Sequence, residues 1–142
     1  EKWWLFFTDA ESGPNSHLYI YYAASPFDQF KPHSNNPVKI DVTNARPAGA
    51  FFVENGKVVR PVQDCAHTYG HKVHLNEVTH LSEHNFEERI MRSLKPSSTW
   101  DNKDGVHHVS VKEQVIAIDS KTHKFIGAHF FRQLRRKLRV SN

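Results

Sequence analysis

Three aspartates recur at a fixed distance along this chain of 142 residues. Asp9, Asp64 and Asp119 each lie at the end of a run of β-type residues, and both intervals between them are 55 residues long. A fixed period of this size is typical of repeat architectures, in which each repeat is one small unit of regular structure. The sequence therefore predicts a β-repeat protein. The alternative is a sandwich of two sheets in which the spacings agree by chance.

Runs of β-branched and aromatic residues separated by turn-forming residues mark the strands. The dipeptide Asn55-Gly56 favours the two positive φ angles of a tight hairpin turn. Around this turn the middle repeat contains four expected strands, at 46–53, 57–63, 73–81 and 86–94. Four successive antiparallel strands make one propeller blade. We therefore expect a middle blade at about residues 46–96.

The flanking repeats contain fewer strands than the middle one. The first has a hairpin at 3–9 and 18–23 without an innermost strand. The last has a pair at 106–111 and 114–118 without outer strands. The predicted fold is thus all-β, a partial β-propeller of about two and a half blades in residues 1–128. Such a partial ring leaves sheet edges open, so we expect a piece of a longer protein.

The net charge of +4 is divided unequally along the chain. Residues 1–123 carry 13 basic and 15 acidic side chains, whereas residues 124–142 carry six basic side chains and no acidic one. The charge of the body therefore argues against nucleic acid as its partner. Residues 129–142 fit a short basic amphipathic helix. This tail could contact an anionic membrane surface, bind nucleic acid, pack on the sheets or remain solvated.

Composition and motif searches limit the remaining classes. The apolar runs are too short for a transmembrane helix. Cys65 is the single cysteine, which excludes an internal disulfide and a cysteine zinc cluster. The histidines near it, His67, His71 and His74, do not have the spacing of a zinc motif. We therefore expect no metal and no cofactor. The absence of a visible signal peptide and of a disulfide slightly favours the cytoplasm.

Polar side chains are expected to gather where the inner strands approach the propeller axis. The inner strands of two neighbouring blades begin near Arg46 and His107, which would point toward a common axis. Guanidinium, amide and carboxylate groups hydrogen-bond sugar hydroxyls, and an aromatic ring can cover the apolar face of a sugar. The predicted ligand-binding residues are therefore Arg46, Arg60, Gln63, Asp64, Tyr69 and His107. The alternative for two of them is a buried Arg46–Asp64 ion pair between blades.

One carboxylate falls on an apolar strand face. Alternation along the strand at 73–81 places Glu77 on the same face as Val73 and Leu75. Such a carboxylate is either paired with an arginine such as Arg60 or is a functional acid with a raised pKa. Asp64 and Glu77 are the candidate catalytic residues, and the sequence leaves open whether the chain is an enzyme.

Several motifs together resemble a known family. They are Ala45–Gly49, Arg60–Cys65, Tyr69-Gly70, Asn76–Val78 and Gly105–His107. They are similar to the N-terminal domain of the plant glucosamine inositolphosphorylceramide transferases and of bacterial proteins that carry the same domain. The resemblance covers about residues 1–122. It implies a five-bladed β-propeller similar to those of glycoside hydrolase family 43, and a link with carbohydrate recognition and glycosyl transfer.

The predicted function is carbohydrate recognition associated with glycosyl transfer to lipid or polysaccharide acceptors, without catalysis by this segment. The expected partners are a carbohydrate or glycoconjugate and the missing blades of the same propeller. One alternative is a glycoside hydrolase-like enzyme, which needs two carboxyl groups about 5–5.5 Å or 6.5–9.5 Å apart. The other is a structural or interaction domain whose tail contacts a membrane surface.

Overall fold

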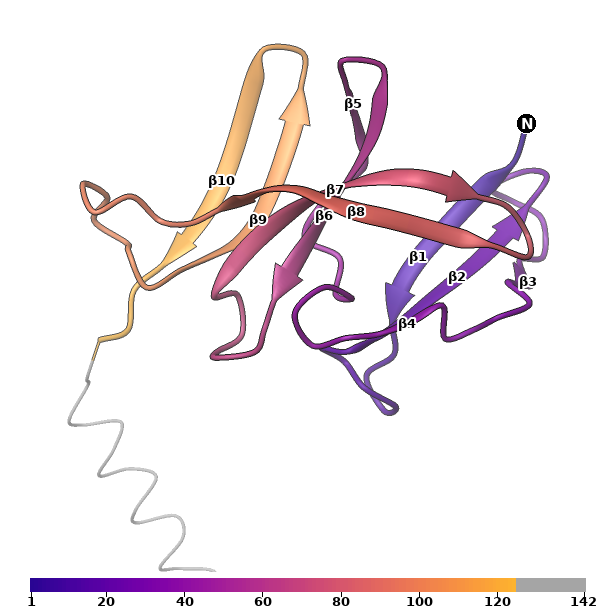
Figure 1. Ribbon diagram of the computed structural model, residues 1–142, viewed down its shortest axis with the longest axis horizontal. Coiled ribbons are helices and arrows are strands. Elements are labelled where there is room, and N and C mark those ends of the chain that lie inside the picture. The colour runs from indigo at the N-terminus through magenta and orange to yellow at the C-terminus, as the bar shows by residue number, and fades with distance from the viewer. Residues whose placement is uncertain (125–142) are drawn as a thin grey trace, which may run out of the picture.

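The computed structural model describes residues 1–124, which form ten β-strands in three antiparallel sheets (Figure 1). The first sheet contains β1 (Trp3–Thr8), β2 (His17–Ala23), β3 (Lys31–Pro32) and β4 (Lys39–Ile40). The middle sheet contains β5 (Phe52–Glu54), β6 (Lys57–Asp64), β7 (Lys72–Leu81) and β8 (Phe86–Leu94). The third contains β9 (Gly105–Lys112) and β10 (Val115–Lys121). The all-β class is thereby confirmed for these residues. The predicted helical tail at 129–142 lies outside them.

The middle sheet has the four-strand order that the sequence predicts. Its strands are hydrogen-bonded in chain order, β5-β6-β7-β8. Asn55 and Gly56 have φ angles of 51° and 74°, the left-handed values that a tight β5–β6 turn requires. The predicted first strand at 46–53 is corrected by the structure, because only residues 52–54 pair as a strand there.

The segment before β5 contacts both the middle and the third sheet, and Pro47 forms an isolated antiparallel bridge with Val62 of β6. The Ala48 amide donates to the Pro61 carbonyl of the middle sheet at 3.0 Å, and the Ala48 carbonyl accepts from the Val109 amide of β9 at 2.8 Å. Gly49 follows with a φ of 152°, and a Cβ atom on it would collide with the Val109 carbonyl. The backbone at Ala48 is therefore bonded on both sides, to β6 of the middle sheet and to β9 of the third sheet.

The first sheet packs against the middle sheet through aromatic side chains. β1 and β2 pair over their length, from Trp3 opposite Ala23 to Thr8 opposite Leu18. The ring of Phe6 lies 4.7 Å from that of Phe51 and 5.6 Å from that of Phe86, between ring centroids. Such aromatic pairs contribute about 0.5–1.5 kcal/mol beyond the area they bury.

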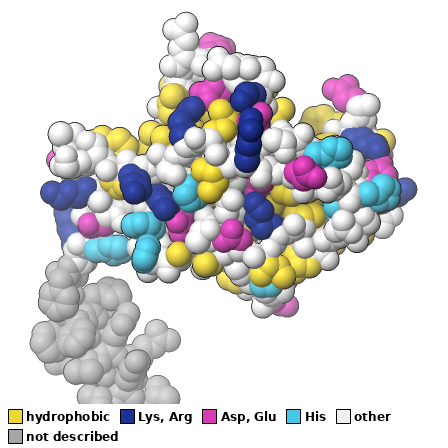
Figure 2. All heavy atoms as spheres, viewed as in Figure 1, with side chains coloured by type: hydrophobic (Ala, Val, Ile, Leu, Met, Phe, Trp, Pro, Cys, Tyr) yellow, Lys and Arg dark blue, Asp and Glu magenta, His cyan; other side chains and the backbone are white. Residues whose placement is uncertain are grey.

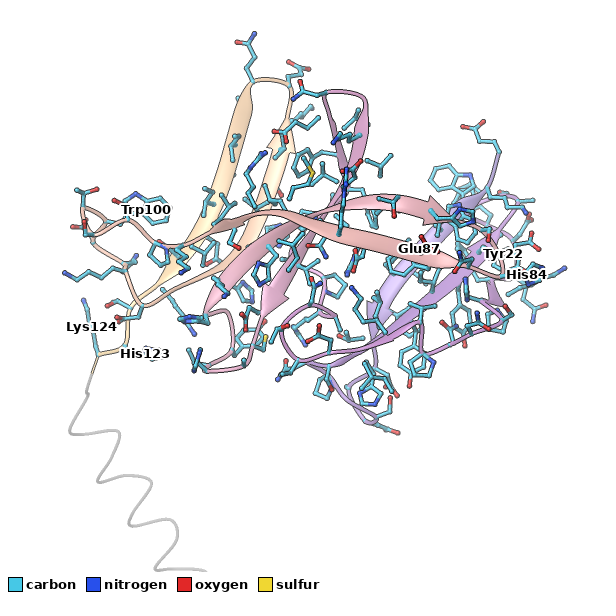
Figure 3. All side chains as sticks on the ribbon, viewed as in Figure 1. Tyr22, His84, Glu87, Trp100, His123 and Lys124 are labelled. Carbon is cyan, nitrogen blue, oxygen red and sulfur yellow. The ribbon has the colours of Figure 1, made fainter. Side chains whose placement is uncertain are left out.

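The third sheet packs against the other side of the middle sheet, so that the middle sheet lies between the two (Figure 1). Val59 of β6 and Val106 of β9 are fully buried in this interface, and Leu75 of β7, at 3% exposure, belongs to the same cluster. Trp100, in the segment between β8 and β9 (Figure 3), packs against the same cluster. Burying a side chain of this kind stabilises a fold by about 1.5–3 kcal/mol.

The surface carries both charges. Lys and Arg, Asp and Glu, and His side chains are intermixed on the face shown in Figure 2. This mixture agrees with the near balance of acidic and basic residues in the body of the chain. Across residues 1–124, no helix is long and apolar enough to cross a membrane.

Candidate functional site

Three of the predicted ligand-binding side chains meet at one place. The guanidinium of Arg46 lies over the Tyr69 ring, with Cζ 5.0 Å from the ring centroid, and its Nη2 is 3.5 Å from the Tyr69 hydroxyl. The Tyr69 hydroxyl is also hydrogen-bonded to Nε2 of His107, and the two ring centroids are 4.8 Å apart. Arg46, Tyr69 and His107, which come from three separate segments, form what we call the rim cluster.

Asp119 fixes the direction of the hydrogen bonds in the rim cluster. Its Oδ2 lies 2.9 Å from Nδ1 of His107. A carboxylate only accepts, so Nδ1 of His107 donates to Asp119, and in the tautomer with a single proton Nε2 accepts from the Tyr69 hydroxyl. The phenolic oxygen can then accept from Arg46. The sequence had marked Asp119 as the end of a repeat and, with Asp9, Asp64 and Glu77, as a candidate carboxylate, but had not paired it with His107.

Two glycines let the β6–β7 loop approach β9 closely enough for Tyr69 to reach His107. Gly70 has a φ of 64°, and a Cβ atom on it would lie 3.2 Å from Cβ of His107. A Cβ atom on Gly105 would collide with the Gly70 carbonyl. Lys121 of β10 also donates to the Tyr69 carbonyl. The loop is therefore held against the third sheet by its backbone as well as by the Tyr69 side chain.

Arg60 lies outside the rim cluster. Its side chain is 1% exposed and forms two hydrogen bonds with Glu88, Nε to Oε2 at 2.8 Å and Nη2 to Oε1 at 2.6 Å. It also donates to the carbonyls of Asn44 and Ala45, at 3.2 and 3.1 Å. A ligand outside the protein therefore cannot reach Arg60. Arg60 instead holds the segment that leads into Arg46. A buried arginine requires an acidic partner, and the sequence did not indicate that this partner is Glu88.

Gln63 and Asp64 form hydrogen bonds with the two segments that carry Arg46 and Tyr69. The Gln63 amide donates to the Arg46 carbonyl at 2.8 Å, and its side chain donates to the Pro47 carbonyl at 3.3 Å. The carboxylate of Asp64 accepts from the Ala66 amide at 2.9 Å, and the Asp64 carbonyl accepts from the His71 amide at 3.2 Å. Gln63 thus fixes the Arg46 segment, and Asp64 shapes the loop that carries Tyr69.

Asp64 is ionised and paired with a lysine, so the alternative of an Arg46–Asp64 ion pair is not what the structure shows. Its Oδ2 lies 3.1 Å from Nζ of Lys72. Burial alone would raise the pKa of Asp64, but the Ala66 amide and Lys72 outweigh it and hold the pKa below its usual value. His74 is 3.6 Å away, but burial lowers its pKa, so it faces Asp64 as a neutral ring at pH 7.

Glu77 is paired as well, although not with Arg60. Its Oε2 lies 2.8 Å from Arg89 Nη2 and 3.1 Å from Lys57 Nζ. The hydrogen bonds from Arg89 and Lys57 lower the pKa of Glu77, whereas a general acid needs a raised pKa.

The strand register separates the two candidate catalytic carboxylates. Glu77 lies opposite Val59, and Asp64 lies opposite Lys72. Five residues of β6 therefore separate the two positions, about 16 Å at 3.3 Å per residue. That is well beyond the separation that glycoside hydrolysis by paired carboxylates requires. The geometry does not favour Asp64 and Glu77 as a catalytic pair.

The histidines near Cys65 are not arranged around a metal position. The rings of His67 and His71 meet edge to face, with their centroids 5.1 Å apart. Burial lowers the pKa of His71, and the neighbouring charge of His67 acts in the same direction. In the part of the chain that the structure describes, no three His, Cys, Asp or Glu side chains could hold a metal ion together.

The rim cluster offers chemistry suited to a polar, non-metal ligand. Tyr69 is 44% exposed and presents a ring face and a hydroxyl at the surface. Nη2 of Arg46 lies beside the Tyr69 hydroxyl, whereas Nη1 donates to the Pro14 carbonyl and to Asn15 at 3.3 Å, and Nε is buried away from solvent. An aromatic face beside directional donors and acceptors is the combination that sequence analysis assigned to a sugar.

Comparison with known proteins decides the family. Residues 1–123 match the family described as glucosamine inositolphosphorylceramide transferase 1, N-terminal. The chain belongs to this family. Its resemblance to the glucosamine inositolphosphorylceramide transferases, which the motifs around Arg60 and Tyr69 had indicated, is thereby confirmed at the level of the N-terminal domain.

Two plant relatives show how much of a larger protein the family domain represents. The chain is 33% identical over 121 residues to glucosamine inositolphosphorylceramide transferase 1 of Oryza sativa subsp. japonica, covering 78% of this chain and 16% of the rice protein. It is 33% identical over 105 residues to the Arabidopsis thaliana protein of the same name, covering 70% of this chain and 14% of that protein. The chain thus spans less than a fifth of either relative. No solved structure matches it significantly.

Proposed function

We propose that this chain is the carbohydrate-recognition part of a protein that transfers a glycosyl group, and that it does not itself catalyse the transfer. Membership of the glucosamine inositolphosphorylceramide transferase 1 N-terminal family supports the association with glycosyl transfer. The pairing and lowered pKa values of Asp64 and Glu77 support the absence of an acid–base pair.

We further propose that the three sheets are blades of a partial five-bladed β-propeller that occupies residues 1–128. Three successive antiparallel sheets, stacked in chain order, are what a propeller requires. The middle sheet has the four consecutive strands of a complete blade. Under this arrangement the missing blades are a partner of the chain, and the rim cluster lies where two blades meet.

The observation that carries the binding proposal is the convergence of Arg46, Tyr69 and His107 from three segments. Polar contacts support two of them: the buried Arg60 and Gln63 hold the Arg46 segment, and Asp119 forms a hydrogen bond with His107 at the surface. A rigid support of this kind lowers the entropy cost of binding a ligand. In this proposal the Tyr69 ring covers the apolar face of a sugar, and Arg46 donates to its hydroxyl groups.

The names of the relatives supply the first ligands to test. They contain glucosamine, inositolphosphorylceramide and the word transferase. Titration calorimetry of the chain with glucosamine, glucose and myo-inositol phosphate would show whether any of them binds. We expect binding of at least one, and at least a tenfold loss of affinity in Tyr69→Ala, because this truncation removes the ring that covers the sugar.

A matched control separates the rim cluster from the general charge of the surface. Arg46→Gln and Arg89→Gln remove the same charge, but Arg89 pairs with Glu77 on an exposed part of the middle sheet. We expect Arg46→Gln to weaken sugar binding and Arg89→Gln to leave it unchanged. Absence of binding to every ligand, or equal effects of the two variants, would contradict the proposal.

A further inference from the structure

The edge of the third sheet is an apolar strand without a neighbour. β10 pairs with β9 along one edge, and among residues 1–124 no strand pairs with its other edge. It is the outer strand of its hairpin in Figure 1. Val115, Ile116 and Ile118 are 68%, 63% and 39% exposed. An unpaired edge of this composition is a template for another strand.

An apolar hollow lies beside this edge. It has a volume of about 110 Å³ and lies between the middle and third sheets. Its apolar lining includes Leu75, Leu94, Val109, Ile116 and Ile118. Exposure rises across it from 1% at Val109 of β9 to 63% at Ile116 of β10. The buried interface between the two sheets therefore continues outward into a surface that nothing in the described chain covers.

The middle sheet shows what covers the equivalent strand. β6, like β10, follows a hairpin turn and ends near a repeat aspartate. β7 pairs with the edge of β6 that β10 leaves free, and Val59 and Val62 of β6 are completely buried. β7 itself presents Val73 and Leu75, two residues apart, to the apolar cluster between the sheets.

The interface between the middle sheet and the first sheet extends as far as β8, the outer strand of the middle sheet. On that side Asn35, between β3 and β4, donates to the His84 carbonyl in the β7–β8 turn at 2.9 Å, and Lys39 of β4 pairs with Glu88 of β8. Tyr22 of the first sheet and His84 of the β7–β8 turn lie at the same end of the molecule (Figure 3). The side facing β9 and β10 lacks this outer cover, because the third sheet has two strands within the described residues.

We propose that the free edge of β10 binds an antiparallel β-strand in which every second side chain is apolar, as in β7. Backbone groups of β10 form the new ladder, and the apolar side chains of the partner cover Ile116, Ile118 and the hollow beside them. This is strand addition, in which main-chain hydrogen bonds supply affinity and alternate side chains supply selectivity. The relatives contain abundant further sequence from which such a strand can come, since the chain aligns with 16% of the rice protein.

A peptide with the sequence of residues 72–81 is the probe, because β7 is the strand that occupies the equivalent edge. Amide hydrogen exchange of the 142-residue chain is followed by NMR with and without the peptide at millimolar concentration. We expect exchange at alternate amides of β10 to slow at least tenfold. A peptide in which Leu75 is replaced by proline should have no such effect, because proline interrupts the ladder and removes an inward side chain.

A matched pair of variants tests the site. Ile116 and Val53 are similarly exposed, at 63% and 71%, but Val53 lies in the β5–β6 hairpin. Ile116→Lys should abolish the protection of β10 by the peptide, whereas Val53→Lys should preserve it. Unchanged exchange of β10, protection that survives in Ile116→Lys, or protection confined to the edge of β1 would overturn the proposal. Concentration-dependent dimerisation that Ile116→Lys abolishes would also overturn it, because the occupant would then be a second copy of the chain.

Discussion

The guanidinium of Arg60 and the carboxylate of Glu88 face each other through two hydrogen bonds, and each side chain is only 1% exposed. Lys39 approaches the same carboxylate from the first sheet. Burial alone would raise the pKa of Glu88, but Arg60 and Lys39 outweigh it and hold the pKa below its usual value. The pair lies between two sheets and supports the segment that carries Arg46, so stability and site geometry depend on the same contact.

Replacing one member of this pair should be far more harmful than replacing both. Glu88→Gln leaves the Arg60 charge buried without a counter-charge, and we expect a loss of about 3–5 kcal/mol in the free energy of unfolding. Arg60→Met with Glu88→Leu should recover most of that loss. Urea denaturation measures both. Glu87→Gln, at an exposed position on the same strand, is the control and should change stability by less than about 0.5 kcal/mol. A mild effect of Glu88→Gln would show that the pair is not essential.

Stability should fall steeply in acid because of Glu88 and Asp64. Both have a folded-state pKa below the ordinary value of about 4 for a carboxyl group. The unfolded chain therefore binds more protons than the folded chain in this range. Their contribution is fully present above the ordinary pKa and is lost as the pH falls through the lowered folded pKa. Chemical denaturation at pH 7, 5, 4 and 3 should show the loss beginning near pH 4, and Asp64→Asn should reduce the slope there.

A separate decline is expected at milder pH from His74. Burial is the largest cause that lowers its pKa, and Lys72 acts in the same direction. The unfolded histidine takes up a proton near pH 6.5, before the folded one does, so stability is present above that pH and declines below it. His74→Gln should flatten the stability profile between pH 7 and 5. His80→Gln, at an exposed position of the same strand, should leave the profile unchanged. If both variants keep the wild-type slope, another group controls it.

Gly105→Ala should loosen the contact between the β6–β7 loop and β9. The added methyl group would collide with the Gly70 carbonyl and with the end of the Lys121 side chain. Overpacking of this kind costs about 1–3 kcal/mol. We expect lower stability in urea together with a changed NMR environment of the His107 ring, because Tyr69 moves with the loop. Lys112→Ala, at an exposed position of the same strand, serves as the control. Wild-type stability and an unchanged His107 signal in Gly105→Ala would contradict this account.

The parts of the structure that sequence analysis predicted are those that local patterns specify. The Asn55-Gly56 turn and the alternation along β6–β8 define four strands in order, and the repeat places Arg46 and His107 near each other. The break before β5 could not be read in this way, because it depends on a bond between Ala48 and Val109, which are distant in sequence. The pairing of Arg60 with Glu88 also depends on how strands meet across sheets. The sequence shows that a buried arginine needs an acidic partner, but it does not show which acidic residue lies beside it.

The bond from the Val109 amide to the Ala48 carbonyl joins neighbouring sheets through the main chain alone. A contact made by the main chain survives most exchanges of the side chains that flank it. The angle between the sheets can therefore be inherited while the sequence changes, and the chain shares 33% identity with the plant proteins. Side chains of the rim cluster could then change without a change in how the two sheets are joined.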